Sequence, residues 1–221
     1  MPEGSKALGV TLPFTEFRAV FISRPFTFWL RLLLTTLVVM IVAACAGAGP
    51  TPDTYDLALP ANVEGIRGGT SAQILVREPR ALAALSTNRI IVRASPIEVT
   101  LLGGVQLPDR LPIVVQARLI EAFELSDGAR AVGAPGDGLL IDFTVSTQIR
   151  KFEIEAFNGG RAIVEISAKL INERNGRVVA SEMFSATAPA TASSTTSSVE
   201  GINAAFGEIV TDIVSWTYRR I

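Results

Sequence analysis

The chain has 221 residues, 48% of them hydrophobic, and a formal net charge of −1, so it can hold one domain with a real core but offers no long-range attraction for nucleic acid. The absence of histidine excludes Ser-His-Asp and Cys-His catalysis and every metal site that relies on imidazole. A single cysteine excludes an internal disulfide and a multi-thiolate metal site, so that thiol needs an explanation of its own.

Residues 1–44 are expected to form a signal peptide. The stretch from Leu32 to Ala44, LLLTTLVVMIVAA, carries no charge and follows a basic segment. The basic residues of that segment are Lys6, Arg18, Arg24 and Arg31. The apolar stretch is shorter than the roughly 20 residues that a membrane-spanning helix needs. A retained membrane anchor is the alternative.

The cysteine follows three aliphatic or small residues, Val42, Ala43 and Ala44. This order resembles the bacterial lipobox, in which small side chains fit the signal peptidase and the cysteine thiol receives a diacylglyceryl group. Cys45 is therefore the expected lipid-attachment site and first residue of the mature protein, with an incidental buried cysteine as the alternative. Ala46, in place of the Asp that retains many lipoproteins at the inner membrane, favours the outer membrane.

Three acyl chains, palmitate among them, would make the attachment effectively irreversible, because each buried methylene contributes about 0.8 kcal/mol. Residues 45–60 are expected to form a flexible tether, because the stretch AGAGPTPDT after Cys45 is rich in Gly, Pro and Ala. Residues 61–221 are expected to form a single domain.

The first half of that domain predicts short strands in AQILVREP and in RIIVRASPIEVTLLGG, followed by a helix in DRLPIVVQARLIEAFE. The helix is indicated by apolar residues at spacings of four, four and three, namely Leu111, Val115, Leu119 and Ala122. Asp109 is expected to cap it, and Pro112 is tolerated in its first turn.

Residues 139–187 predict an antiparallel meander of three strands. LLIDFTVSTQI and AIVEISAKLIN alternate between apolar and polar residues, and RVVASEMFSAT supplies the third strand. Asn158-Gly159 and Asn175-Gly176 are typical of type I′ hairpin turns.

A second helix is expected after the Ser/Thr-rich loop APATASSTTSS, starting at a capping box formed by Ser197 and Glu200. Its apolar residues form one stripe: Ile202, Phe206, Ile209, Ile213 and Trp216. The predicted fold class is α+β, a two-layer sandwich in which two main helices cover one face of an antiparallel or mixed sheet of about six strands.

The sequence shows no phosphate-binding loop, and we expect no cofactor, no metal and no enzymatic activity. Its candidate carboxylates are expected to be solvated on the polar faces of strands: Asp142, Glu153, Glu155 and Glu165. The pattern favours a binding or coupling protein.

Seven segments occur in an order that is similar to the ABC-type transport auxiliary lipoprotein family, from about Tyr55 to Trp216. They are YDLALP, LVREPRALAALSTNRIIVR, LPDRLPIVVQARLIEAFE, FTVSTQIRKFEIE, AIVEISAKLIN, GRVVASEMFSATAPA and INAAFGEIVTDIVSW. The resemblance implies a periplasmic lipoprotein that docks a mammalian-cell-entry (MCE) protein carrying phospholipid or sterol-like lipid. The permease and ATPase of the same system would be indirect partners, and a homo-oligomeric ring is a further candidate.

Four residues match a segment of the family, Asp109, Arg110, Leu111 and Pro112, and are candidate interface residues. A plain helix start is the favoured alternative, because it explains Asp109 and Pro112 without any partner. The tryptophan that often precedes these residues in the family is missing here. Two functions of other classes stay open: a lipoprotein scaffold or activator of an envelope-synthesis enzyme, and a lipid carrier with a hydrophobic groove between helices and sheet.

Overall fold

The computed structural model describes residues 28–37, 51–66 and 69–221, and the chain divides into two units, residues 1–49 and 50–221. Residues 28–37 of the first unit form a helix with exposed side chains. Among the helices of the described ranges, none is long and apolar enough to cross a membrane. Cys45 and the three lipobox residues before it lie outside the described residues.

The second unit is built on a mixed sheet of seven strands, which confirms the predicted α+β class. The predicted meander forms one side of this sheet, from the central β7 (Phe143–Glu155) through β8 (Arg161–Asn172) to the edge strand β9 (Arg177–Pro189), and its strands pair antiparallel. The first turn has positive φ at Asn158 and Gly159, as predicted, but Asn175 lacks it, so the second turn is not type I′. Only Gly176 takes the left-handed conformation there.

The other edge of β7 is shared by two short parallel strands. β2 (Gln73–Val76) pairs with the beginning of β7, and β6 (Ala131–Gly133) lies outside β2. β3 (Ile91–Arg93) pairs with the end of β7, and the antiparallel β4 (Val99–Leu101) lies outside β3.

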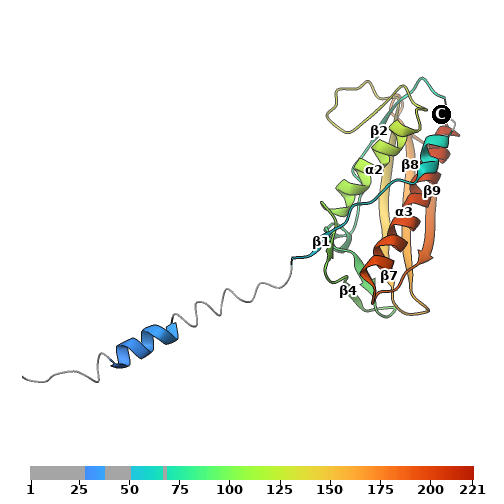
Figure 1. The fold of residues 1–221 in the computed structure, drawn as a ribbon. Coiled ribbons are helices and arrows are strands. Elements are labelled where there is room, and N and C mark those ends of the chain that lie inside the picture. Colours follow the sequence, from blue (N-terminus) through green and yellow to red (C-terminus); the bar gives the residue numbers. More distant parts are fainter. Residues whose placement is uncertain (1–27, 38–50, 67–68) are drawn as a thin grey trace, which may run out of the picture. The chain divides into compact units, whose positions relative to one another are not determined.

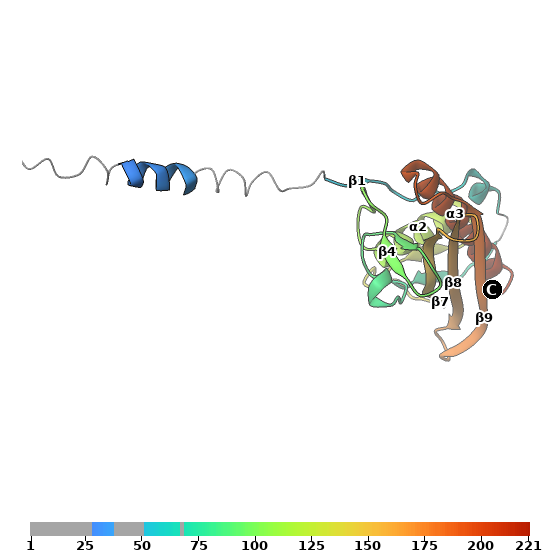
Figure 2. The same cartoon turned by 90° about the horizontal axis from the view of Figure 1, so that it is seen from below.

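Two helices cover one face of this sheet, as predicted: α2 (Leu111–Leu125) and α3 (Thr195–Tyr218) (Figures 1 and 2). All nine residues of the two predicted apolar stripes are at most 1% exposed, because both helices turn these stripes toward the sheet. Edge-to-face aromatic pairs join the layers, with ring centroids 6.3 Å apart for Phe152 and Phe206 and 5.7 Å apart for Phe184 and Trp216.

Both helices start differently from the predictions. No side chain caps α2, whose N-cap residue is Arg110, and Asp109 instead accepts a hydrogen bond from the Arg110 amide at 2.6 Å. α3 begins before the predicted capping box, because the Ser194 side chain accepts from the Ser197 amide at 3.3 Å. Ser197 then accepts from the Thr191 amide at 3.1 Å, which ties the preceding loop to the first turn.

The predicted tether extended to residue 60, but residues 53–60, here called the strap, are packed on the domain. Its first two residues form β1 (Asp53–Thr54), parallel to β5 (Val105–Gln106). Leu57 is only 3% exposed, and the Ala58 amide donates to the Asn203 side chain at 2.7 Å. The strap is followed by the short helix η1 (Ala61–Gly65), so the folded unit starts before residue 61.

The alternation of apolar and polar residues predicted a strand over residues 139–149, and the structure confirms only its part from Phe143 onward. β7 begins at Phe143, and a register irregularity between Ile149 and Lys151 moves the helix-facing positions from odd to even numbers. Glu153 and Glu155 therefore lie on the face away from the helices, where they are buried rather than solvated. Arg93 binds both carboxylate oxygens of Glu153 at 2.8 Å, which neutralises the buried charge.

Candidate functional site

The four candidate interface residues divide into an exposed and a buried pair. Asp109 and Arg110 are exposed at the start of α2, and the Arg110 guanidinium lies 3.5 Å from the Glu78 carboxylate. Leu111 and Pro112 are buried in the core, and the Leu111 amide donates to the Thr87 carbonyl at 2.9 Å. Leu111 and Pro112 therefore start and anchor the helix, and only Asp109 and Arg110 can meet a partner.

The strap brings the predicted anchor side of the chain onto the helical layer. Arg118 of α2 forms ion pairs with Asp56 of the strap and with Glu121 of its own helix. Burial lowers the pKa of Arg118, and the hydrogen bonds and negative charges of Glu121 and Asp56 raise it. The carboxylates outweigh burial, so the pKa of Arg118 lies above its usual value. Gly207 of α3 leaves room for Pro60, since a Cβ there would lie 3.2 Å from the proline ring.

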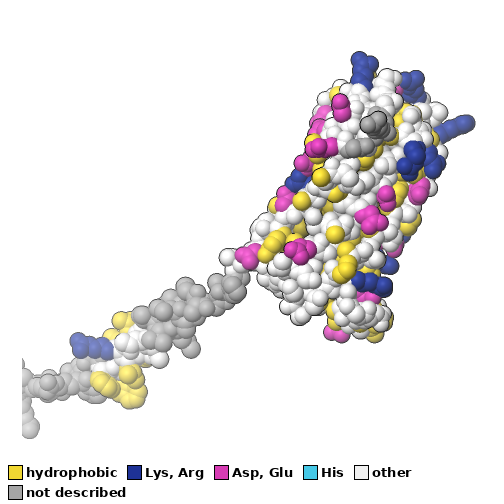
Figure 3. Space-filling view, turned by 45° about the vertical axis from the view of Figure 1, so that its right-hand side comes forward, with side chains coloured by type: hydrophobic (Ala, Val, Ile, Leu, Met, Phe, Trp, Pro, Cys, Tyr) yellow, Lys and Arg dark blue, Asp and Glu magenta, His cyan; other side chains and the backbone are white. Residues whose placement is uncertain are grey.

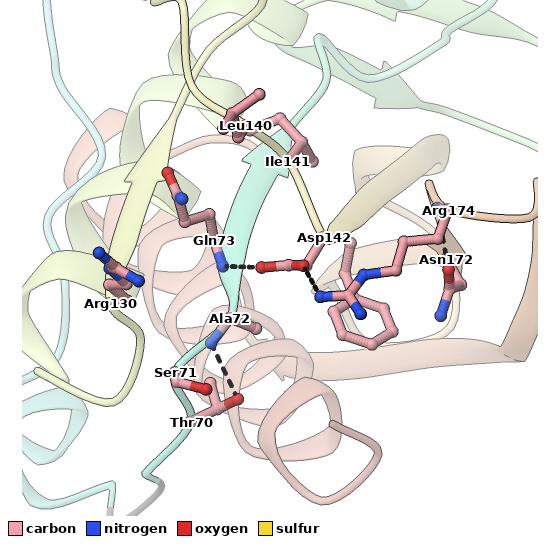
Figure 4. Close-up of a pocket in the computed structure, with 11 residues that line it drawn as sticks. Thr70, Ser71, Ala72, Gln73, Arg130, Leu140, Ile141, Asp142, Asn172 and Arg174 are labelled. Atoms are coloured by element: carbon pink, nitrogen blue, oxygen red, sulfur yellow. Dashed lines mark hydrogen bonds and ion pairs between the residues drawn. The ribbon is translucent and has the colours of Figure 1, made fainter.

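A solvent-open hollow of about 700 Å³ lies where β2 and β7 begin and β8 ends (Figure 4). Its lining is supplied by the segments before β2 and before β6, the loop before β7 and the turn after β8. The residues that matter for its chemistry are Gln73, Arg130, Leu140, Ile141, Asp142 and Arg174. A second hollow, of about 310 Å³, lies at the end of α2 and along β6.

Asp142 organises the first hollow. One of its carboxylate oxygens accepts from the Gln73 amide at 3.0 Å, and the other accepts from Arg174 at 2.7 Å (Figure 4). The Gln73 amide above all, with help from Arg174, lowers the pKa of Asp142 below its ordinary value. Asp142 is thus held as a carboxylate that joins β2 to the turn after β8.

Arg130 lies on the opposite side of the hollow and is exposed. Within the described part of the chain no carboxylate lies within 4.0 Å of its guanidinium. The lining therefore contains two guanidinium groups and one carboxylate, and it favours a negatively charged group.

The sequence did not single out this hollow. Asp142 was expected to be a solvated residue of a strand face, and Arg130 and Arg174 carried no recognisable motif. The one available signal was the loop GAPGDGLLID, in which glycines and an aspartate directly precede the longest alternating strand. Sequence spacing does not show that residues 73, 130, 142 and 174 meet.

Charges elsewhere in the described part of the domain do not gather into a metal site. No group of three or more Cys, Asp or Glu side chains suited to a metal ion occurs within residues 28–37, 51–66 and 69–221. Acidic and basic side chains are interspersed on the face of the domain shown in Figure 3. Glu155 and Glu165, like Glu153, lie close to basic side chains, with Arg161 at 2.9 Å and Lys151 at 3.4 Å.

Comparison with known proteins shows which family and which relatives this chain resembles. The family model of the ABC-type transport auxiliary lipoprotein component matches residues 55–214. An uncharacterised protein of Bradyrhizobium diazoefficiens is 32% identical over 174 residues, which are 77% of this chain and 46% of that protein. This chain thus spans about half the length of that relative.

Two solved structures are similar in fold. A crystal structure of a Xanthomonas campestris protein has 25% sequence identity and a TM-score of 0.67, covering 76% of this chain and 96% of the other. A second crystal structure, of an uncharacterised protein, has 12% identity and a TM-score of 0.60, covering 76% and 99% of the two chains.

Proposed function

Because the chain belongs to the ABC-type transport auxiliary lipoprotein family, we propose that it docks the MCE protein of an ABC-type lipid transport system while tethered to the outer membrane. The family match to residues 55–214 carries this proposal, since it runs from the strap to the last turns of α3. The proposed cargo is phospholipid or a sterol-like lipid. The domain acts by binding, with the permease and ATPase as indirect partners.

The strap limits how far the domain reaches from its proposed anchor. Because Asp53 already pairs with β5, only the eight residue steps from Cys45 to Asp53 separate the lipid from the fold. A fully extended chain of that length spans at most about 28 Å. The domain is therefore held close to the membrane surface, which suits a dock for an assembly that arrives from the opposite membrane.

Asp109 and Arg110 are the proposed contact residues. Both are exposed at the start of α2, and the side chains of Leu111 and Pro112 beneath them fix the position of the backbone. An exposed pair of opposite charges on a rigid helix start contributes to register and association rate more than to affinity. We therefore expect the pair to orient a partner that other surfaces also hold.

Lipid carriage in a groove between α3 and the sheet receives no support from the two hollows described above. Neither hollow is lined by a residue of α3, which covers most of the meander. The space between α3 and the sheet is instead filled by the aromatic and aliphatic core. Docking is thus better supported than carriage through the centre of the domain.

The test is co-purification of the full-length chain with an MCE protein, from membranes of its own host. We expect the native chain to capture the MCE protein. Cys45→Ser should no longer capture it from the outer-membrane fraction, and Asp109→Ala/Arg110→Ala should capture less of it. Intact-mass measurement of the native chain should show a diacylglyceryl thioether on Cys45. The double variant Glu208→Ala/Arg219→Ala is a matched control, because it also removes one charge of each sign from exposed positions.

Three results would contradict the proposal. An unmodified, uncleaved leader would return the chain to the membrane-anchor alternative. Capture of a cell-wall synthesis enzyme in place of the MCE protein would support the scaffold or activator alternative. No capture, together with unchanged outer-membrane permeability after deletion, would remove the transport role.

A further inference from the structure

The hollow at the start of β2 and β7 combines one uncompensated positive charge with an apolar rim. Arg174 is paired with Asp142 at 2.7 Å, while Arg130 has no carboxylate within 4.0 Å in the part of the chain that the structure describes and interacts with Asp142 only at longer range. Gln73 and Asn172 contribute side-chain amides to the lining, and Thr70 and Ser71 contribute hydroxyl groups. These groups can donate hydrogen bonds to the oxygens of an anion that Arg130 attracts.

The rim of the same hollow is apolar and unusually exposed. Leu140 is 85% exposed, and Ile141 and Phe143, which also line the hollow, are half-buried. Leu140 and Ile141 lie together above the polar groups in Figure 4. An aliphatic chain laid across this rim would remove Leu140 from water, which is favourable in proportion to the apolar area covered.

We infer that this hollow binds an acidic group, phosphate or carboxylate, carried on an aliphatic chain. Arg130 binds the anion, Asp142 holds Arg174 and the Gln73 backbone in place around it, and Leu140 and Ile141 contact the chain. The volume of about 700 Å³ lies within the range of small-molecule sites. This inference does not rest on the docking function, because the ligand is defined by the chemistry of the hollow alone.

Calorimetric titration of the full-length chain in nanodiscs of zwitterionic phosphatidylcholine tests it. The probes are hexyl phosphate, hexanoate, inorganic phosphate and hexanol. We expect saturable binding of a hexyl anion, with affinity about tenfold or more above those of inorganic phosphate and hexanol. Comparison of hexyl phosphate with hexanoate identifies which acid the hollow prefers.

Substitution of two exposed residues, Arg130 and Leu140, tests the polar and the apolar half of the site individually. Arg130→Gln should weaken binding of the hexyl anion about tenfold or more, since it removes a charge-assisted hydrogen bond. Leu140→Ser should weaken the hexyl anion and leave inorganic phosphate unchanged. Arg150→Gln is the matched control, because Arg150 is exposed and lies seven residues along β7 from Phe143, about 24 Å away.

Absence of saturable binding for both hexyl anions would overturn the inference. Equal losses in Arg130→Gln and Arg150→Gln would do the same, because they would reveal general charge attraction. Equal affinities for inorganic phosphate and hexyl phosphate would show that the aliphatic chain does not contribute to binding, which would also contradict the inference.

Discussion

At the scale of single residues, Asp142 shows how one carboxylate can hold three chain segments. Its side chain binds the Gln73 amide and Arg174, while its own amide donates to the Gln73 carbonyl at 3.0 Å and its carbonyl accepts from the Glu173 amide at 2.9 Å. The strand β2, the start of β7 and the turn after β8 are thereby joined at one point.

The lowered pKa of Asp142 makes its contribution depend on pH. Since its pKa is lower in the folded than in the unfolded chain, the stabilisation is complete above the ordinary value of 3.8 and disappears as pH falls through the folded-state value. Urea unfolding of Asp142→Asn should therefore show lower stability than the native chain at pH 7, and a gap that closes below about pH 3.8. The exposed Asp212→Asn is the control, and a gap that is constant with pH would contradict the assignment.

At the scale of elements, α3 lies close to the end of β9 at Gly201. A Cβ at this position would lie 2.6 Å from the Pro189 carbonyl oxygen and 2.9 Å from the Ala190 Cβ. The end of β9 and the first turns of α3 therefore pack backbone to backbone. A glycine within a helix is intrinsically unfavourable, so the close approach is its structural reason.

Gly201→Ala should consequently destabilise the domain in spite of alanine's higher helix propensity. The overlap with backbone atoms costs about 1–3 kcal/mol, against a propensity gain of about 1 kcal/mol. Gly207→Ala is the comparison, because its Cβ would meet only the ring of Pro60, at 3.2 Å or more. We expect a lower midpoint of thermal unfolding for Gly201→Ala and little change for Gly207→Ala; the reverse order would contradict this packing.

At the scale of the whole molecule, the strap makes residues 53–60 part of the fold. It pairs with β5, forms an ion pair with α2 and hydrogen-bonds to α3, so it holds the two helices together from outside. Leu57 inserts into the core at 3% exposure. A pull on the N-terminal side of the strap is therefore transmitted to the helical layer through these contacts.

Leu57→Ala tests whether the strap is bound in solution. Removal of a buried leucine side chain should lower the free energy of unfolding by about 2–4 kcal/mol, measured by urea denaturation. Asp53→Ala, at an exposed position of the same strap, should change it by less than about 0.5 kcal/mol. A Leu57→Ala value as small as that of Asp53→Ala would mean that the strap is the free tether that its composition suggests.

The sequence by itself determined the two helical stripes, the three-stranded meander and the fold class, because each depends on periodic burial within one segment. It also placed the buried Leu111 and Pro112 at a helix start. Only the tertiary structure decided which distant segments lie next to each other, because such contacts leave no periodic pattern in the sequence. Arg93 with Glu153, Leu57 in the core, and the hollow that joins Arg130 to Asp142 all arise because the sheet order places separate segments side by side.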